Sequence, residues 1–117
     1  MERNPYVWNL AVAVAGVFLK QATVGFPLTN KASQSKIVTV GLNTGKTGLG
    51  LTLLPPKVID WWSWEYVCWP LLAELETRSD LPFQASGVQV AEYLYDLLYD
   101  RLVALGKVPA RSTLIQS

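Results

Sequence analysis

The segment from Asn4 to Leu19 constrains the fold most, because it has no charged residue and is apolar on nearly every side when placed on a helix. Asn4 followed by Pro5 is a typical helix start, with asparagine as the N-cap and proline at the first helical position. A helix that is apolar all round is buried in a protein or lies in a membrane. We therefore predict an N-terminal helix that is buried in the protein or in an interface.

Two other interpretations of this segment stay open. Its uncharged part spans about 24 Å at ~1.5 Å per residue, short of the ~30 Å hydrocarbon core of a bilayer. A membrane helix over residues 5–19 is therefore the second choice. A strand is the third, since Leu10, Val12 and Val14 alternate with alanines.

The composition indicates a chain that associates with other proteins. The 117 residues suit a single domain over 1–117, yet 50% are hydrophobic, 16% are charged and the mean hydropathy is +0.22. A chain this short cannot bury so much apolar surface alone, so we expect part of it to face a partner chain or lipid. The net charge of +1 gives no basic excess of the kind that nucleic acids select for, and we predict no nucleic-acid partner.

The chemistry-bearing residues argue against an enzyme. The chain has no histidine, which removes the commonest general base and metal ligand, and it excludes Ser-His and Cys-His pairs within the chain. Its single cysteine, Cys68, falls among apolar residues and is predicted to be an inert buried thiol. We predict no catalytic, cofactor-binding or metal-binding residues.

A β-hairpin is predicted in the middle of the chain, after a loop or extended arm over residues 21–36 that is rich in helix-breaking residues. Two stretches with period-two alternation flank turn residues 43–46. The inward face would carry Val38, Val40, Leu42, Leu49, Leu51 and Leu53. The other face would carry Thr39, Gly41, Gly50 and Thr52. Because this second face is bare, we expect a neighbouring protein to approach it closely.

The turn of this hairpin resembles the end of a phosphate-binding loop, because it reads Gly45-Lys46-Thr47. That loop needs a glycine five residues before Gly45, and this position holds Val40. It also needs a helix that starts at the lysine, whereas glycines and prolines follow here. The stretch therefore predicts a hairpin turn with Lys46 in solvent.

A tryptophan-rich helix is predicted after residue 59, with Asp60 as its N-cap and with Pro70 kinking or dividing it. Tryptophan serves as a core residue and as an interface anchor, so we name Trp61, Trp62, Trp64 and Trp69 as core or interface residues. A helix on a membrane surface is the alternative. Glu65 lies in the apolar arc, and we expect it to pair with a lysine or arginine or to lie at the rim. The alternative is a carboxyl group with a raised pKa that acts as an acid or base.

The last helix has the clearest pattern, from Ser86 as N-cap to Gly106 at its end, with Pro109 preventing continuation. Its apolar stripe comprises Val88, Ala91, Leu94, Tyr95, Leu98, Leu102 and Leu105, and its wet face comprises Gln89, Glu92, Asp96 and Asp100. The acidic ladder is interpreted as a solvated face, with a neighbour's arm bearing Arg111 as the alternative partner. Residues 107–117 are predicted to be an extended arm.

Together these patterns predict an α+β domain with an N-terminal apolar helix, a central β-hairpin and two C-terminal helices. The function we expect is that of a non-enzymatic structural subunit of a virion or a large intracellular assembly. The most specific form is a phage virion protein, such as a capsid cement or head-tail connector protein, bound to copies of itself and to a larger structural protein. The alternative is an accessory subunit of a membrane complex, with residues 5–19 in the bilayer.

Overall fold

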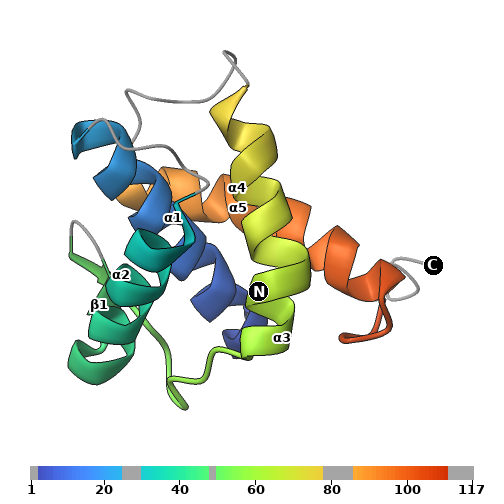
Figure 1. The fold of residues 1–117 in the computed structure, drawn as a ribbon. Helices are drawn as coiled ribbons and strands as arrows, with labels where there is room; N and C mark the ends of the chain where they lie inside the picture. The colour runs from blue at the N-terminus through green and yellow to red at the C-terminus, as the bar shows by residue number, and fades with distance from the viewer. Residues whose placement is uncertain (1–2, 25–29, 48–49, 78–85, 111–117) are drawn as a thin grey trace.

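The computed structural model describes residues 3–24, 30–47, 50–77 and 86–110. Within them the chain is mostly helical, with a small antiparallel pair of strands (Figure 1). The elements in chain order are α1 (Pro5–Val24), α2 (Lys31–Thr44), β1 (Lys46–Thr47), β2 (Leu51–Thr52), α3 (Trp61–Ser63), η2 (Trp64–Cys68), α4 (Trp69–Glu76) and α5 (Gly87–Ala104). The predicted α+β class is confirmed, although the sheet is much smaller than expected.

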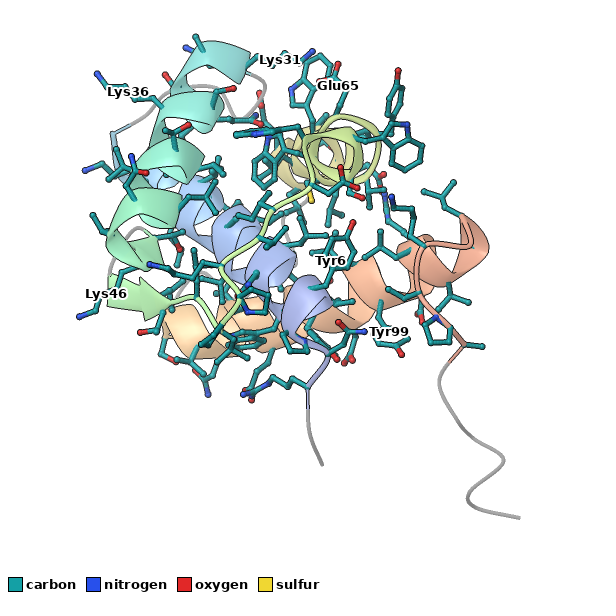
Figure 2. All side chains as sticks on the ribbon, turned by 90° about the horizontal axis from the view of Figure 1, so that it is seen from below. Tyr6, Lys31, Lys36, Lys46, Glu65 and Tyr99 are labelled. Carbon is teal, nitrogen blue, oxygen red and sulfur yellow. The ribbon has the colours of Figure 1, made fainter. Side chains whose placement is uncertain are left out.

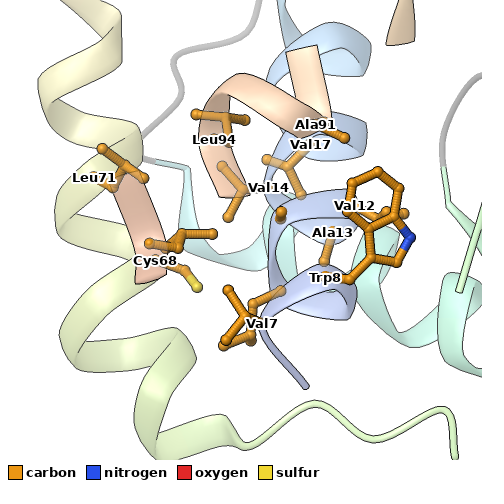
Figure 3. Packing of buried hydrophobic residues seen from close by; sticks show 14 of the residues in the cluster. Val7, Trp8, Val12, Ala13, Val14, Val17, Cys68, Leu71, Ala91 and Leu94 are labelled. Carbon is orange, nitrogen blue, oxygen red and sulfur yellow. The ribbon is translucent and has the colours of Figure 1, made fainter. Parts of the chain in front are cut away.

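Helix α1 is the centre of the fold. It begins as predicted, since the Asn4 Oδ1 atom accepts a hydrogen bond from the backbone N–H of Tyr6 at 3.0 Å. Every residue from 7 to 18 is buried, because α2, α5, the two strands and η2 all pack against this helix. Figure 3 shows part of this core, with Leu94 of α5 next to Val14. The apolar character of α1 is thus accounted for by contacts within the chain.

Two buried polar residues, Asn9 on α1 and Thr47 on β1, tie the central segment to this helix. The Asn9 amide donates to the carbonyls of Leu54 at 2.9 Å and Pro56 at 3.2 Å, and its oxygen accepts from the Leu54 N–H at 2.7 Å. The Thr47 hydroxyl donates to the Val12 carbonyl at 3.0 Å. Because these groups are buried and paired, they fix where residues 47–56 lie along α1.

The prediction that residues 38–42 form a strand is wrong, because they lie within helix α2. The Asn30 side chain caps the helix by accepting from the Ser33 N–H, and Gly45 ends it in the left-handed conformation. The buried residues Gln34, Val38 and Gly41 recur with helical spacing against α1 and β1. The same apolar residues fit both periods, and packing on α1 selects the helix.

The hairpin that does form is short, with Lys46 opposite Thr52 and Thr47 opposite Leu51. The residues that were predicted to face inward therefore differ in how far they are buried. Val38, Leu51 and Leu53 are buried, Leu42 is half-buried, Val40 is 54% exposed, and Leu49 lies outside the described residues. The expectation of an inward Val40 is therefore wrong, because a helix turns this side chain to the opposite side from Val38.

Both predicted arms need correction where the structure describes them. Residues 21–24 belong to α1 and residues 31–36 to α2, while 25–29 lie outside the described part. Residues 107–110 lie against the fold, because Val108 is buried and the Tyr99 hydroxyl donates to the Pro109 carbonyl at 3.2 Å. The arm predicted over 111–117 lies outside the described residues.

Helix α5 is confirmed at both ends. The Ser86 hydroxyl accepts from the Gln89 N–H at 3.2 Å, and the Gln89 side chain accepts from the Ser86 N–H at 3.0 Å, which completes a capping box. Gly106 has a φ of 75°, and the Lys107 N–H donates to the Leu102 carbonyl at 2.9 Å. This is the backbone pattern of a glycine-terminated helix.

Candidate interaction surface

Large aromatic side chains are exposed where the tryptophan-rich helix begins. Trp61 is 47% exposed, Trp62 is 46% exposed and Tyr66 is 64% exposed, and the neighbouring Val58 is also exposed. The rings of Trp62 and Tyr66 are in contact, with centroids 5.1 Å apart. We refer to Val58, Trp61, Trp62 and Tyr66 as the aromatic surface. Tryptophan and tyrosine are the residues most enriched at binding hot spots, so this surface is the candidate site.

The backbone beneath this surface is a wide π-helical turn, η2, between the short α3 and α4. The N–H of Trp69 donates to the carbonyl of Trp64, five residues back. Pro70, which has no N–H to donate, follows directly. Helical segments α3, η2 and α4 follow one another without a gap, so Pro70 coincides with a change from π to α turns and not with the predicted break in the helix. Such π turns occur often at functional sites.

A polar cluster holds the start of this helix in place. The Asp60 carboxylate caps α3 by accepting from the Trp62 N–H at 2.9 Å, and it also accepts from the Ser63 hydroxyl at 3.1 Å. The Lys107 ammonium lies 2.9 Å from the same carboxylate and 5.0 Å from the centre of the Trp62 ring. The Tyr6 hydroxyl contacts Ser63 and Asp60. Residues from α1, α3 and the end of α5 therefore meet beside the aromatic surface.

The charges in this cluster stabilise one another. The hydrogen bond from Lys107 is the main cause that lowers the pKa of Asp60, and the same bond raises the pKa of Lys107. Burial is the main cause that raises the pKa of Tyr6. At neutral pH Asp60 is therefore a carboxylate, Lys107 an ammonium and Tyr6 a neutral phenol. This arrangement orients Trp62 and connects the end of α5 to α3.

At the far side of η2, Lys31 of α2 reaches the same helix. Its ammonium lies 2.5 Å from the Glu65 carboxylate and 4.0 Å from the centre of the Trp69 ring (Figure 2). The prediction that Glu65 pairs with a basic residue is confirmed. Cys68 is buried, which confirms its predicted place in the core, and burial raises the pKa of its thiol.

The residues named from the sequence do not form one face. Trp61 and Trp62 lie on the aromatic surface, whereas Trp64 is buried and Trp69 is half-buried. The predicted Thr/Gly face is wrong, because its members lie on a helix and on a separate hairpin. Thr39, Gly50 and Thr52 are exposed, Gly41 is buried, and Arg111 lies outside the described residues.

The close approach predicted for these glycines occurs within the chain, at Gly41. A Cβ atom there would lie 2.4 Å from the Thr47 Cγ2 atom, so only glycine lets α2 pack this closely on β1. Sequence reasoning missed Tyr66 and the cluster of Tyr6, Asp60 and Lys107. Tyr66 follows Trp62 by four residues, which was a usable signal, but the cluster joins residues too far apart in sequence to predict.

No family model, no curated protein and no solved structure matches this chain. Over the described residues, no group of three histidine, cysteine, aspartate or glutamate side chains is arranged to hold a metal ion. In the same part of the chain, no helix combines the length and the hydropathy that a membrane crossing requires.

Proposed function

We propose that this protein is a non-enzymatic structural subunit of a larger protein assembly and that the aromatic surface is where it binds a partner subunit. One observation carries the proposal. The chain buries every residue from 7 to 18, yet it leaves Trp61 and Trp62 about half exposed and Tyr66 64% exposed. Such rings can bury a large apolar area against a partner at little cost in side-chain entropy.

The cluster around Asp60 supports this proposal, since Asp60 accepts from the Trp62 backbone N–H and the Lys107 ammonium lies 5.0 Å from the centre of the Trp62 ring. A preorganised anchor binds more tightly than a mobile one because less freedom is lost on binding. The most specific form of the proposal is a virion protein of a tailed phage, such as a capsid cement or head-tail connector protein. Its support is the composition, which is charge-poor, apolar and free of histidine.

The test is to fractionate the native source by size. The amount of the wild-type chain and of each variant is then measured in every fraction. We expect wild-type chain to travel with large particles. Trp62→Ser combined with Tyr66→Ser should reduce this fraction, with affinity about thirtyfold weaker, because these residues would be hot spots. Val88→Ser is the matched control, since Val88 is an equally exposed apolar residue outside the aromatic surface.

Two outcomes would contradict the proposal. One is a wild-type chain that travels alone. The other is equal recovery of the Trp62/Tyr66 variant and the Val88 control in the particle fraction. Recovery in floated membranes would instead favour the accessory subunit of a membrane complex. In that case residues 5–19 would have to leave the helices that now enclose them.

A further inference from the structure

The charges of this chain are divided between two regions of the sequence, despite a net charge of only +1. Residues 20–57 contain no acidic residue and five lysines, which are Lys20, Lys31, Lys36, Lys46 and Lys57. Residues 60–100 contain no lysine, one arginine and eight of the nine acidic residues, which are Asp60, Glu65, Glu74, Glu76, Asp80, Glu92, Asp96 and Asp100. Because the two regions fold into different helices, the basic and the acidic residues lie on different surfaces of the molecule.

The outer side of α2 carries the basic charge. Its exposed residues Lys36, Thr39, Val40 and Asn43 recur at helical spacing, and the exposed Lys46 follows the end of the helix. We refer to these five residues as the basic face. In Figure 2, Lys31, Lys36 and Lys46 are spread along this side of the molecule. Val40, which is 54% exposed, provides an apolar centre between the charges.

The outer side of α5 carries the acidic charge. Glu92, Asp96 and Asp100 are all exposed and lie four residues apart, and we refer to them as the acidic face. Arg3 pairs with Glu92 and so offsets part of this charge. Helices α2 and α5 each pack on α1, with α1 between them (Figure 1). The two faces therefore belong to different sides of one molecule.

The dimensions of the two faces correspond. From Glu92 to Asp100 is eight residues, or about 12 Å along α5. On the basic face, Lys36 lies about 12 Å from the end of α2 at Thr44, and Lys46 follows directly, with the uncharged Thr39, Val40 and Asn43 between the two lysines. Two charged faces of similar length and opposite sign attract each other and guide two protein surfaces together.

We propose that the basic face of one copy of this chain binds the acidic face of the next copy. A second copy is the partner that fits, because each molecule carries both a basic and an acidic face and so supplies the charge that the next copy needs. Since the two faces differ, the contact is head-to-tail and repeats into a ring or a row. This deepens the proposed function by naming a copy of the chain as one partner, and it leaves the aromatic surface for another.

Charge reversal on each face tests the proposal with purified full-length chain. Lys36→Glu and Asp100→Lys should each weaken self-association about tenfold at low salt, as measured by sedimentation velocity. Neither reversal opposes its helix dipole, because Lys36 lies in the N-terminal half of α2 and Asp100 in the C-terminal half of α5. Lys36→Arg and Asp100→Glu are matched controls that keep the charge and should associate like wild type.

Mixing the two reversed variants separates this contact from general charge effects. In the mixture, Glu at position 36 faces Lys at position 100, and the unaltered faces meet as before, so association should return to the wild-type level. The proposal is overturned if the mixture stays monomeric, if the variants associate like wild type, or if a monomeric wild type binds anionic vesicles through Lys36. Because only purified chain is used, failure here leaves the test of the aromatic surface unaffected.

Discussion

Helices α2 and α5 pack on the same central helix but are specified in different ways. Both have a side-chain N-cap, Asn30 or Ser86, and both are followed by a glycine with positive φ, Gly45 or Gly106. Nine of the 18 residues of α5 are good helix formers, among them four leucines and two alanines, whereas α2 has five such residues among 14 and is rich in serine, threonine and valine. The comparison shows that end signals and tertiary packing are enough to form a helix from a poor helical sequence.

The two helices also differ in what they bury. α5 buries three leucines, Leu94, Leu98 and Leu102, whereas the fully buried residues of α2 are Gln34, Val38 and Gly41. Helix α5 therefore contributes much more apolar area to the core, and α2 depends on close fit instead. Substitutions in α2, in α5 and at their ends should therefore change the stability of the fold by different amounts.

The largest effect is expected from truncation of the α5 core. Leu98→Ala should lower the free energy of unfolding by about 2–5 kcal/mol, because it leaves a cavity against α1. Val38→Ala on α2 should cost less, about 1.5 kcal/mol for the apolar groups removed. Urea unfolding measures both, with Val40→Ala as an exposed control. A larger loss for Val38→Ala than for Leu98→Ala would contradict the comparison.

The next effect tests the close fit of α2. Gly41→Ala should destabilise the fold by about 1–2 kcal/mol, because the added Cβ meets Thr47 Cγ2 and this clash outweighs the helix propensity of alanine. Thr47→Ser removes Cγ2 but keeps the hydroxyl that bonds Val12. The cost of Gly41→Ala should therefore shrink in the Thr47→Ser background. Equal costs in both backgrounds, measured by urea unfolding, would show that the clash is absent.

A smaller difference is expected between the two N-caps. Ser86→Ala should cost about 1 kcal/mol, since it breaks a reciprocal capping box, and Asn30→Ala should cost about 0.5 kcal/mol, since only one bond is lost. Thermal unfolding of each variant gives the comparison. Ser86→Thr is the control that retains a capping hydroxyl. A lower melting temperature for the Asn30 variant than for the Ser86 variant would contradict this prediction, because it would mean that α2 depends on its N-cap more than α5 does.

The smallest effect concerns the end of α5, where Lys107 binds Asp60. The pKa of Asp60 is lowered in the fold from an ordinary value of 3.8, chiefly by the Lys107 hydrogen bond. Its contribution to stability is therefore present above this ordinary pKa and is lost as pH falls through the lower, folded-state pKa. Asp60→Asn keeps a capping side chain but cannot titrate. Its melting temperature should fall less steeply on acidification than that of wild type. If the two melting temperatures fall in parallel as the pH is lowered, the prediction is wrong.

The sequence predicted the helices whose signals are local. Asn4 and Pro5 start α1, Ser86 and Gly106 bound α5, and Asp60 starts the tryptophan-rich helix. In α2 the local signals conflict, because the β-branched run from Ile37 to Val40 favours a strand while the caps favour a helix. Contacts with α1 and β1 decide between them, and no local pattern contains those contacts.

The candidate surface was predictable only in part. Its composition is visible in the sequence, but the exposure of Trp61 and Trp62 and the burial of Trp64 are seen only in the folded chain. The cluster that fixes Trp62 joins residues 6, 60 and 107, which only the folded chain brings together. The acidic ladder was visible as a pattern, whereas its basic counterpart required α2 to be a helix.

We propose that this chain works as a subunit whose helices α2 and α5 carry complementary faces. The apparent mass of the purified wild-type chain, measured by light scattering over a wide concentration range at low and high salt, tests it most directly. We expect a mass that rises above 13.0 kDa with concentration at low salt and returns toward 13.0 kDa at high salt, where charges are screened. A constant 13.0 kDa at every concentration and salt would contradict it.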